Sequence, residues 1–257
     1  MTFSDETIWI IGASSGIGEA LAKQLAAENA TIILSARSTD KLEQIQKEIG
    51  EHHLIFPLDT SDEKAVYTTY EAIMEKVPTL DRVLFMAGIY EPTNIEGIDT
   101  AFAQQIMNVN FMGAIYTTQA VLPVFKKQGA GQIVLCASVA GYSGLPNGQP
   151  YSASKAALIN FAESLHAEVP KNIDVKVINP GFVETPLTDK NDFEMPMCIT
   201  PDQAATAIIK GLQSKNFEIH FPKKFTYLVK LLTSLPYFLK LKISKKLAEK
   251  RLLKETK

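Results

Sequence analysis

Residues 8–18 read IWIIGASSGIG and carry the clearest structural signal in the sequence. The first four of these residues are large and apolar and predict a buried strand, and a helix-like pattern begins behind Gly12, Gly16 and Gly18. Small residues at the start of a helix leave its free amides accessible to a phosphate. The spacing is G-x-x-x-G-x-G, not the more familiar G-x-G-x-x-G. A plain strand-to-helix loop is the alternative, so the surrounding pattern must decide.

Apolar, β-rich runs alternate with helix-period segments on the C-terminal side of this stretch. The expected strands are Thr7–Ile11, Thr31–Ser35, Leu54–Leu58, Arg82–Met86, Gln132–Ala137, Asp174–Ile178 and Phe217–Phe221. The expected helices are Gly16–Glu28, Thr39–Ile49, Asp62–Lys76, Ile98–Lys127, Pro150–Glu168 and Pro201–Ser214. Such alternation predicts an α/β fold, a single doubly wound domain over residues 1–221 with a parallel sheet. Its ligand should lie beyond the carboxyl ends of the strands.

Composition narrows the class of protein. The chain has 257 residues, of which 46% are apolar and 21% charged, enough to bury a core without a disulfide or metal. Only two cysteines occur, Cys136 and Cys198, which suits a reducing compartment, and acids stand at Asp5 and Glu6 where a signal peptide would be basic. We therefore expect a cytoplasmic protein.

The net charge of −2 conceals two blocks of opposite sign. Residues 222–257 hold eleven Lys and Arg against two acids, a charge of +9, so residues 1–221 carry −11. An acidic body argues against nucleic-acid binding, whereas the basic block suggests an anionic partner.

The end of the second expected strand bears on the choice of dinucleotide. A free ribose 2′-hydroxyl is usually held by a carboxylate about 20 residues after the glycines, and a 2′-phosphate by an arginine. Arg37 stands there, with no acid before Asp40. A solvated Arg37 is the alternative, but a cation is unfavourable at a helix start. The sequence therefore favours NADP over NAD, with Ser14 or Ser15 assisting Arg37.

Tyr151 and Lys155 lie four residues apart at the start of an expected helix, on one face. No acid occurs between Asp99 and Glu163, so Lys155 must reach solvent, a ligand or a distant carboxylate. A nearby cation stabilises phenolate, so we expect Lys155 to lower the pKa of Tyr151 toward the working range of a general acid–base. Chance alone would supply such a pair in many sequences, so the pair needs its context.

These residues occur in the order and spacing of the short-chain dehydrogenase/reductases, which the chain resembles over residues 7–221. The resemblance is carried by Gly12-x-x-x-Gly16-x-Gly18, Asn110, Ser138, Tyr151-Ser-Ala-Ser-Lys155 and Asn179-Pro-Gly-Phe-Val-Glu-Thr185. It implies an NAD(P)-dependent oxidoreductase with a Rossmann-type domain and a seven-stranded parallel sheet. By position it makes Tyr151 the acid–base, Lys155 the residue that binds the nicotinamide ribose, Ser138 the residue that orients the substrate oxygen, and Asn110 the support of a proton-relay water.

The resemblance also implies a cofactor-binding set. It consists of Gly12, Ser14, Ser15, Gly16, Ile17, Gly18, Arg37, Asp59, Thr60, Ala87, Gly88, Tyr151, Lys155, Pro180, Gly181, Val183 and Thr185. Asp59 corresponds to the residue that contacts the adenine, and Arg37 to the position associated with NADP preference. The chain departs from the family at Ile11, where Thr is usual, and at Phe85-Met86, where two asparagines are usual.

No metal site is expected. His166 and His220 have no metal-ligand spacing around them, and no C-x-x-C pattern exists. Cys136 lies two residues from Ser138, but a buried structural thiol explains it better than redox chemistry.

The leading functional hypothesis is an NADP(H)-dependent enzyme that interconverts a small-molecule carbonyl compound and a secondary alcohol. The alternative is a non-catalytic NADP-binding sensor or scaffold, since fold does not fix function. Substrate specificity is expected from 186–200, a loop with two prolines and two methionines. The resemblance also leads us to expect a homodimer or homotetramer.

Residues 222–257 form a C-terminal extension that mixes large apolar residues with lysines. Its longest uncharged run, Leu231–Leu239, is far shorter than the roughly 20 residues of a spanning helix. Basic charge beside Leu, Phe and Tyr is typical of a segment lying in an anionic membrane interface, which would favour a lipophilic substrate. The alternative is packing on a partner subunit or over the substrate mouth. Pro236 should break the extension into two helices.

Overall fold

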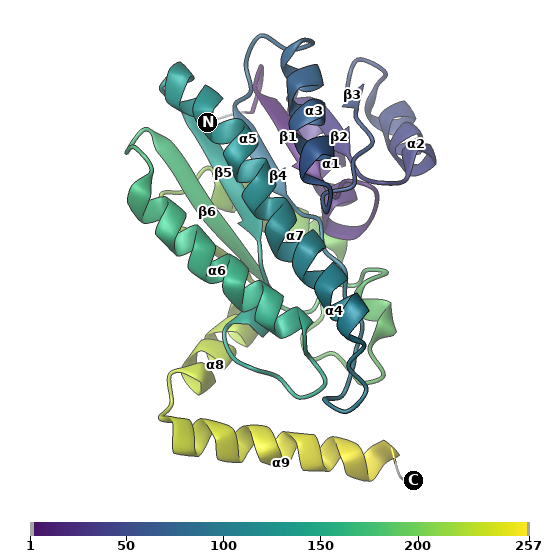
Figure 1. Cartoon of the computed structure of the whole chain (residues 1–257), viewed down its shortest axis with the longest axis vertical. Helices are drawn as coiled ribbons and strands as arrows, with labels where there is room; N and C mark the ends of the chain where they lie inside the picture. The colour runs from purple at the N-terminus through teal and green to yellow at the C-terminus, as the bar shows by residue number, and fades with distance from the viewer. Residues whose placement is uncertain (1–2, 256–257) are drawn as a thin grey trace.

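A computed structural model describes residues 3–255. Its centre is a seven-stranded parallel sheet in the order β3-β2-β1-β4-β5-β6-β7, with helices on both faces (Figure 1). The strands are β1 Thr7–Ile11, β2 Thr31–Ser35, β3 Leu54–Ile55, β4 Arg82–Phe85, β5 Gly131–Cys136, β6 Ile173–Pro180 and β7 Glu218–Phe221. The helices are α1 Gly16–Ala27, α2 Thr39–Ile49, α3 Glu63–Met74, α4 Thr100–Met107, α5 Gly113–Gln128, α6 Tyr151–Glu168, α7 Pro201–Leu212, α8 Lys223–Thr233 and α9 Tyr237–Glu255. The predicted fold class is confirmed.

Alternation along β1 builds two cores. Ile8 and Ile10 pack on the face covered by α1 and α7, whereas Trp9 and Ile11 pack on the face covered by α3, α5 and α6. Successive strand residues point to opposite faces, so a continuous apolar run is what a strand with helices on both sides requires.

The strand order reverses at β1, which pairs with β2 on one side and with β4 on the other. The chain from β1 proceeds outward through β2 and β3, and then returns to build β4 to β7 on the opposite side. A crevice opens where the order reverses, outside the carboxyl ends of the strands. This edge of the sheet is therefore where a ligand is expected.

The helix expected over 98–127 is interrupted. It is divided into α4, a π-helical turn at Asn108–Met112, and α5. Asn110 lies in this turn, where its amide Nδ2 donates to Ile89 O at 3.0 Å and its Oδ1 accepts from Ile89 N at 2.8 Å. These two bonds tie the turn to the segment after β4, a long-range contact that helical periodicity does not reveal. π-turns of this kind occur frequently at functional sites.

The basic extension forms two helices with Pro236 between them, as predicted. α8 packs beside β7 at the edge of the sheet, and α9 projects below the body of the molecule (Figure 1). No helix in 3–255 combines the length and the apolar character that a membrane crossing needs.

Candidate active site

The glycine-rich turn brings backbone close to backbone at the end of β1. Gly12 has φ +91°, and a Cβ there would lie 2.6 Å from Ala87 N. A Cβ on Gly18 would lie 2.1 Å from Gly12 O, so α1 can start directly against the turn only with glycine there. Ser15, the N-cap of α1, makes no side-chain capping bond. The first amides of α1 are therefore available to a phosphate at the positive end of the helix.

A cavity of about 660 Å³ extends from this turn along the carboxyl ends of the strands. Its walls follow β1, β2, β4, β5 and β6, the strands on both sides of the reversal in strand order. The following residues predicted from the sequence line it: Gly12, Ser14, Ser15, Gly16, Ile17, Gly18, Arg37, Asp59, Thr60, Ala87, Gly88, Ser138, Tyr151, Lys155, Pro180, Gly181, Val183 and Thr185. Asn110 is the one predicted site residue that lies behind the wall rather than in it.

Arg37 and Asp59 meet at one end of the cavity. Burial raises the pKa of Asp59, but hydrogen bonds from Ser61 and the charge of Arg37 outweigh it and leave that pKa below the ordinary value. The Asp59 Oδ1 accepts from Ser61 N at 2.9 Å and from Ser61 Oγ at 2.7 Å. Asp59 is thus a fixed carboxylate, and Arg37 remains an exposed cation beside it.

Lys41 also lines this end and was missed by the sequence analysis. It lies in the first turn of α2, four residues after Arg37. Two cations therefore border the same end of the cavity. The spacing was visible in the sequence, but a lysine in an exposed helix has no signal of its own.

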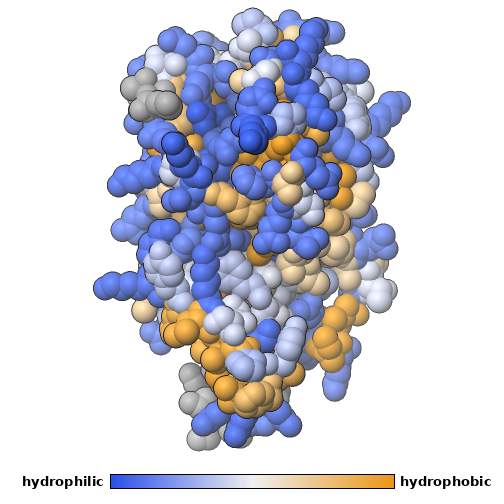
Figure 2. All heavy atoms as spheres, turned by 90° about the vertical axis from the view of Figure 1, so that its left-hand side faces the viewer, coloured by the Kyte–Doolittle hydropathy of each residue, from blue (hydrophilic) through white to orange (hydrophobic). Residues whose placement is uncertain are grey.

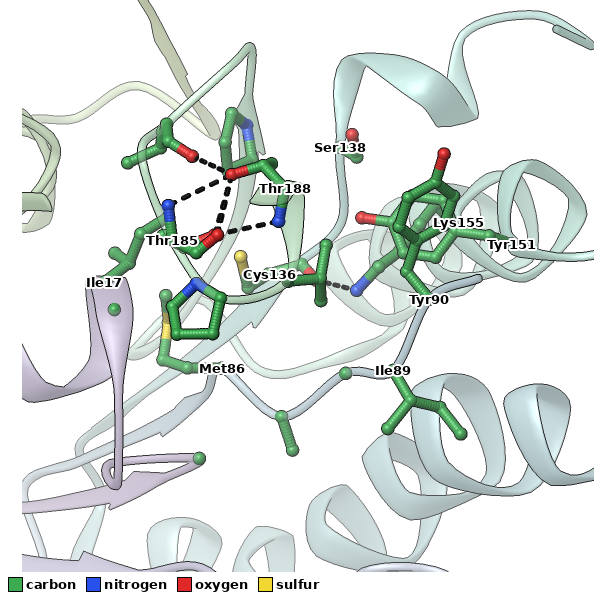
Figure 3. Close-up of a pocket in the computed structure, with 18 of the residues that line it drawn as sticks. Ile17, Met86, Ile89, Tyr90, Cys136, Ser138, Tyr151, Lys155, Thr185 and Thr188 are labelled. Atoms are coloured by element: carbon green, nitrogen blue, oxygen red, sulfur yellow. Dashed lines mark hydrogen bonds between the residues drawn. The ribbon is translucent and has the colours of Figure 1, made fainter. Parts of the chain in front are cut away.

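Tyr151 and Lys155 lie at the opposite end, on the first turns of α6 (Figure 3). Lys155 is almost fully buried, and its Nζ donates to Cys136 O at 2.7 Å. The same Nζ lies 5.6 Å from the centroid of the Tyr151 ring. The sequence analysis expected Lys155 to reach solvent, a ligand or a distant carboxylate, whereas the structure places its charge on a backbone carbonyl in the wall of the cavity.

The expected lowering of the Tyr151 pKa by Lys155 is not what the structure shows. Burial raises the pKa of Tyr151 above its ordinary value, and contact with the Ser138 side chain offsets only part of this. Burial also lowers the pKa of Lys155, which weakens it as a source of positive charge. Desolvation disfavours both charged forms at once, and residue spacing alone gives no measure of it.

Ser138 begins the short 3₁₀ turn Val139–Gly141 after β5. Its Oγ accepts from Ala140 N at 3.1 Å, which fixes the side chain at the strand end. Figure 3 shows Ser138 on the same side of the cavity as Tyr151 and Lys155. The structure thus brings together the three residues that the resemblance assigns to the substrate oxygen, the proton transfer and the nicotinamide ribose.

Asn110 is buried behind the cavity wall at this end. Beyond its two bonds to Ile89, its Nδ2 donates to Ser154 Oγ at 3.0 Å on α6. A Cβ on Gly88 would lie 3.4 Å from Lys155 Nζ and 3.5 Å from Asn110 Oδ1, so a glycine separates the two side chains. Asn110 therefore positions α6 and the segment after β4 relative to each other.

The loop after β6 closes the cavity from the side of Thr185. Thr185 Oγ1 and Thr188 Oγ1 lie 3.1 Å apart, and Thr188 Oγ1 accepts from Thr185 N at 3.0 Å (Figure 3). A Cβ on Gly16 would lie 2.9 Å from Thr185 Cγ2. The loop is thereby folded on itself and brought against the glycine-rich turn.

Aromatic and aliphatic side chains surround the mouth next to Tyr151. The Phe182 ring lies 5.7 Å from that of Phe193 and 5.3 Å from that of Phe225, between ring centroids. Phe225 and Val229 reach this wall from α8. The sequence analysis named packing over the substrate mouth as one alternative for the extension, and these two residues place α8 at the wall of the cavity. Which residues of α8 face inward depends on its docking, so they were not predicted.

Comparison with known proteins identifies the family. A family model described as short chain dehydrogenase matches residues 6–195. The chain belongs to the short-chain dehydrogenase/reductase family. It is thus an oxidoreductase by family.

Its relatives within the family are moderately similar in sequence. An uncharacterized oxidoreductase of Staphylococcus haemolyticus is 32% identical over 79% of this chain and 89% of its own length. The 3-ketodihydrosphingosine reductase of Bos taurus is 32% identical over 81% of this chain and 68% of its own length.

Solved short-chain dehydrogenase/reductase structures share the fold and hold either dinucleotide. A family member from Burkholderia phymatum in complex with NAD superposes with a TM-score of 0.83 at 20% identity, covering 90% of this chain and 94% of its own. An alcohol dehydrogenase from the archaeon Thermococcus sibiricus, complexed with 5-hydroxy-NADP, gives a TM-score of 0.78 at 26% identity, covering 85% and 96%. Membership of the family therefore leaves the choice between NAD and NADP open.

The two departures from the short-chain dehydrogenase/reductase pattern lie in the core. Ile11 and Phe85 are fully buried and pack on the same face of the sheet. Met86 lines the cavity, and its N–H donates to Ile11 O at 2.8 Å. Apolar packing thus occupies the positions where this family usually has polar side chains.

Among residues 3–255, no group of three or more His, Cys, Asp or Glu side chains is placed to hold a metal ion. Cys136 is a free, buried thiol whose pKa burial raises.

Proposed function

We propose that the protein is an NADP(H)-dependent oxidoreductase that interconverts a carbonyl compound and a secondary alcohol. The observation that carries this proposal is one continuous cavity with phosphate-binding features at one end and Ser138, Tyr151 and Lys155 at the other. The residues at either end alone could have an ordinary structural role, whereas a dinucleotide-sized cavity that joins the two ends is not explained by such roles.

The residues present fit the cofactor. Close backbone approach at Gly12 and Gly18 leaves room beside the uncapped amides of α1, where a pyrophosphate would bind. Arg37 and Lys41 supply two cations at the adenosine end, where a 2′-phosphate would be held. Asp59 is committed to Ser61 and lies beside Arg37, so it supports an adenine contact rather than a ribose one.

The nicotinamide of the bound cofactor supplies or accepts the hydride. The chain's own residues place the other partners of the reaction. Ser138 donates a hydrogen bond to the substrate oxygen and orients it. Tyr151 then gives its phenolic proton to that oxygen in the reductive direction and takes it back in the oxidative direction. The raised pKa of Tyr151 keeps the phenol protonated at neutral pH, which favours reduction.

Lys155 and Asn110 are assigned supporting roles. Lys155 donates to Cys136 O, so its position is fixed before a cofactor ribose arrives. Asn110 bonds to Ile89 and Ser154, and it thereby positions the segment after β4 against α6, which carries Lys155.

The walls near Tyr151 favour an apolar substrate. Phe182, Phe193, Phe225 and Val229 offer no charge to a ligand, so burial of apolar surface would drive binding there. The reductase activities named for the Bos taurus relative and for a Brucella melitensis structural neighbour, a 3-ketoacyl-(acyl-carrier-protein) reductase, act on ketones and support this class of substrate. A sensor or scaffold would not need Ser138, Tyr151 and Lys155 together.

The test measures NADPH and NADH oxidation with aldehydes and ketones whose alkyl chains increase in length. We expect turnover with NADPH and a rise in kcat/KM as the chain lengthens. Cofactor binding without turnover of any carbonyl or alcohol, in either direction, would support the sensor or scaffold and overturn the proposal.

A further inference from the structure

α8 has two apolar faces with different surroundings. Phe225 and Val229 point into the cavity wall, whereas Tyr227, Leu228 and Leu231 point to solvent. Leu231 is 63% exposed, and the exposed Tyr227 and Leu228 lie one turn before it on the same helix, so the three form a group. The outward face is therefore available for binding.

Large apolar side chains are also exposed at the start of α9. Phe238 is 73% exposed and Leu241 is 59% exposed, and they are separated by Lys240, whose Nζ lies 4.4 Å from the Tyr237 ring centroid. Hydrophobic atoms gather at the lower end of the molecule, where α8 and α9 lie (Figure 2). We define the tail surface as the exposed residues Lys224, Tyr227, Leu228, Leu231, Tyr237, Phe238, Leu241, Lys242, Lys245 and Lys246.

α8 is anchored to the body by an ion pair. Lys230 Nζ and Tyr142 OH both donate to the Glu218 carboxylate, and Asn179 Nδ2 donates to its Oε1 at 2.7 Å. α9 makes no extensive contact with any other element in the described range. Because α8 is fixed to the body, α9 is held as a basic helix that projects from it.

Charge separates the tail from the body. Residues 222–257 carry +9 and residues 1–221 carry −11. An anionic surface would attract the tail and repel the body, so it would bind the molecule in one orientation. Lysines beside Phe, Leu and Tyr can keep their charges in the headgroup layer while the apolar groups enter the acyl boundary.

The body offers little apolar surface that a second copy could place on the tail. Outside the tail, the large apolar side chains that are exposed in residues 3–255 are Ile95, Leu145, Phe193 and Met197. Two of them, Leu145 and Phe193, line the cavity. Charge attraction alone would pair the tail with an acidic body but would leave Leu231 and Phe238 without an apolar partner.

We propose that the tail surface docks the protein on an anionic lipid bilayer, with α8 and α9 lying in the interface rather than spanning it. The helices are too short in uncharged length to span. Docking by α8 places the bilayer on the opposite side of the helix from the cavity. This inference concerns binding only and does not depend on the proposed reaction.

The test is co-sedimentation of the full chain with vesicles of phosphatidylcholine alone or with added phosphatidylglycerol. We expect sedimentation with the mixed vesicles at low salt, and at least about tenfold weaker binding to neutral vesicles. Added salt should release much of the bound protein, because the Debye length falls to about 8 Å at 0.15 M.

Two matched pairs of variants separate the charge and apolar contributions. Lys242→Glu, Lys245→Glu and Lys246→Glu combined should weaken binding at least about tenfold, whereas Lys64→Glu, Lys126→Glu and Lys127→Glu combined make the same change in net charge on the body and should weaken it less. Leu231→Ser with Phe238→Ser should also weaken it about tenfold or more. Ile95→Ser with Met197→Ser, which remove apolar side chains exposed outside the tail, should leave it unchanged.

Protein that stays in the supernatant with anionic vesicles at low salt overturns the proposal. Equal weakening by the tail and body charge variants overturns it too, because binding would then follow net charge. Sedimentation velocity without lipid tests whether a second copy of the chain covers the tail surface instead of a bilayer. If Leu231→Ser with Phe238→Ser splits an oligomer and wild type does not bind vesicles, the tail surface belongs to a second copy.

Discussion

The two ends of the cavity are built in opposite ways. At the Arg37 end, two exposed cations and a carboxylate fixed by Ser61 stand on loops and on the first turn of α2. At the Tyr151 end, the phenol is half-buried and the ammonium is buried, both on α6, and Lys155 is bonded to the Cys136 carbonyl.

In the proposed reaction, this difference separates the selection of the cofactor, at the Arg37 end, from the proton transfer, at the Tyr151 end. Exposed charges are screened and rearrange easily, so the Arg37 end can change its preference without disturbing the fold. Buried polar groups depend on each contact around them, so the Tyr151 end should tolerate little change. The effects of substitutions at the two ends, on turnover and on cofactor preference, should therefore differ in size and in kind.

The largest effect is expected for Tyr151→Phe. The ring and its packing remain, but the proton carrier is lost, so turnover should fall below about a hundredth of wild type while cofactor affinity is kept. Steady-state kinetics and a cofactor fluorescence titration would measure the two quantities.

Tyr90→Phe is the matched control, because the Tyr90 ring lies 4.9 Å from the Tyr151 ring, between centroids, and its OH contacts Asn191. Its loss of turnover should be much smaller. An equal loss in the two variants would mean that Tyr151 is not the unique proton donor.

A shift of cofactor preference is expected for Arg37→Asp. The change removes a phosphate partner, repels a 2′-phosphate and offers a ribose hydroxyl an acceptor. The NADPH to NADH ratio of kcat/KM should fall by at least about tenfold with one carbonyl substrate. Lys47→Asp, a charge reversal in the last turn of α2, should leave the ratio unchanged. A ratio that Arg37→Asp does not move would remove Arg37 from the 2′-phosphate site.

The pH dependence should differ between the two directions. Burial raises the pKa of Tyr151, so the phenol is the proton donor throughout neutral pH, and reduction should be nearly flat between about pH 6 and 8. Oxidation needs the deprotonated form, which below the pKa grows about tenfold per pH unit, so its rate should rise steeply with pH. Initial rates in both directions over this range test it, and a level oxidation profile would contradict the direction of the shift.

The smallest effect is expected for Lys41→Ala. Lys41 is exposed, so its contribution to binding a phosphate should be worth only a few-fold in KM for NADPH and nothing for NADH. Combined with Arg37→Ala, the loss should differ from the sum of the two single losses, because side chains that hold one phosphate are coupled. An equal change in KM for NADH and NADPH would place Lys41 outside the 2′-phosphate site.

The sequence predicts the Arg37 end and the fold better than it predicts the details of the Tyr151 end. Alternation and the glycine spacing are local signals; they predicted β1 and α1 correctly, and Arg37 lines the cavity at the end of β2. The π-turn at Asn110 is tied to Ile89, 21 residues away, by a hydrogen bond that helical periodicity cannot report. The raised pKa of Tyr151 follows from burial by side chains distant in sequence. Phe225 and Val229 enter the cavity only because α8 docks on β7.

The Glu218 carboxylate joins the tail to the body of the molecule, because it accepts hydrogen bonds from Lys230 on α8 and from Tyr142 and Asn179 in the body. A chain cut after Phe221 would lose Lys230 and leave the half-buried Glu218 carboxylate facing Tyr142 without its cation, and it would also remove Phe225 from the cavity wall. Uncompensated buried charge is costly. The extension therefore cannot be exchanged between relatives like an attached module, and a graft of α8 would have to bring the partners of Lys230 with it.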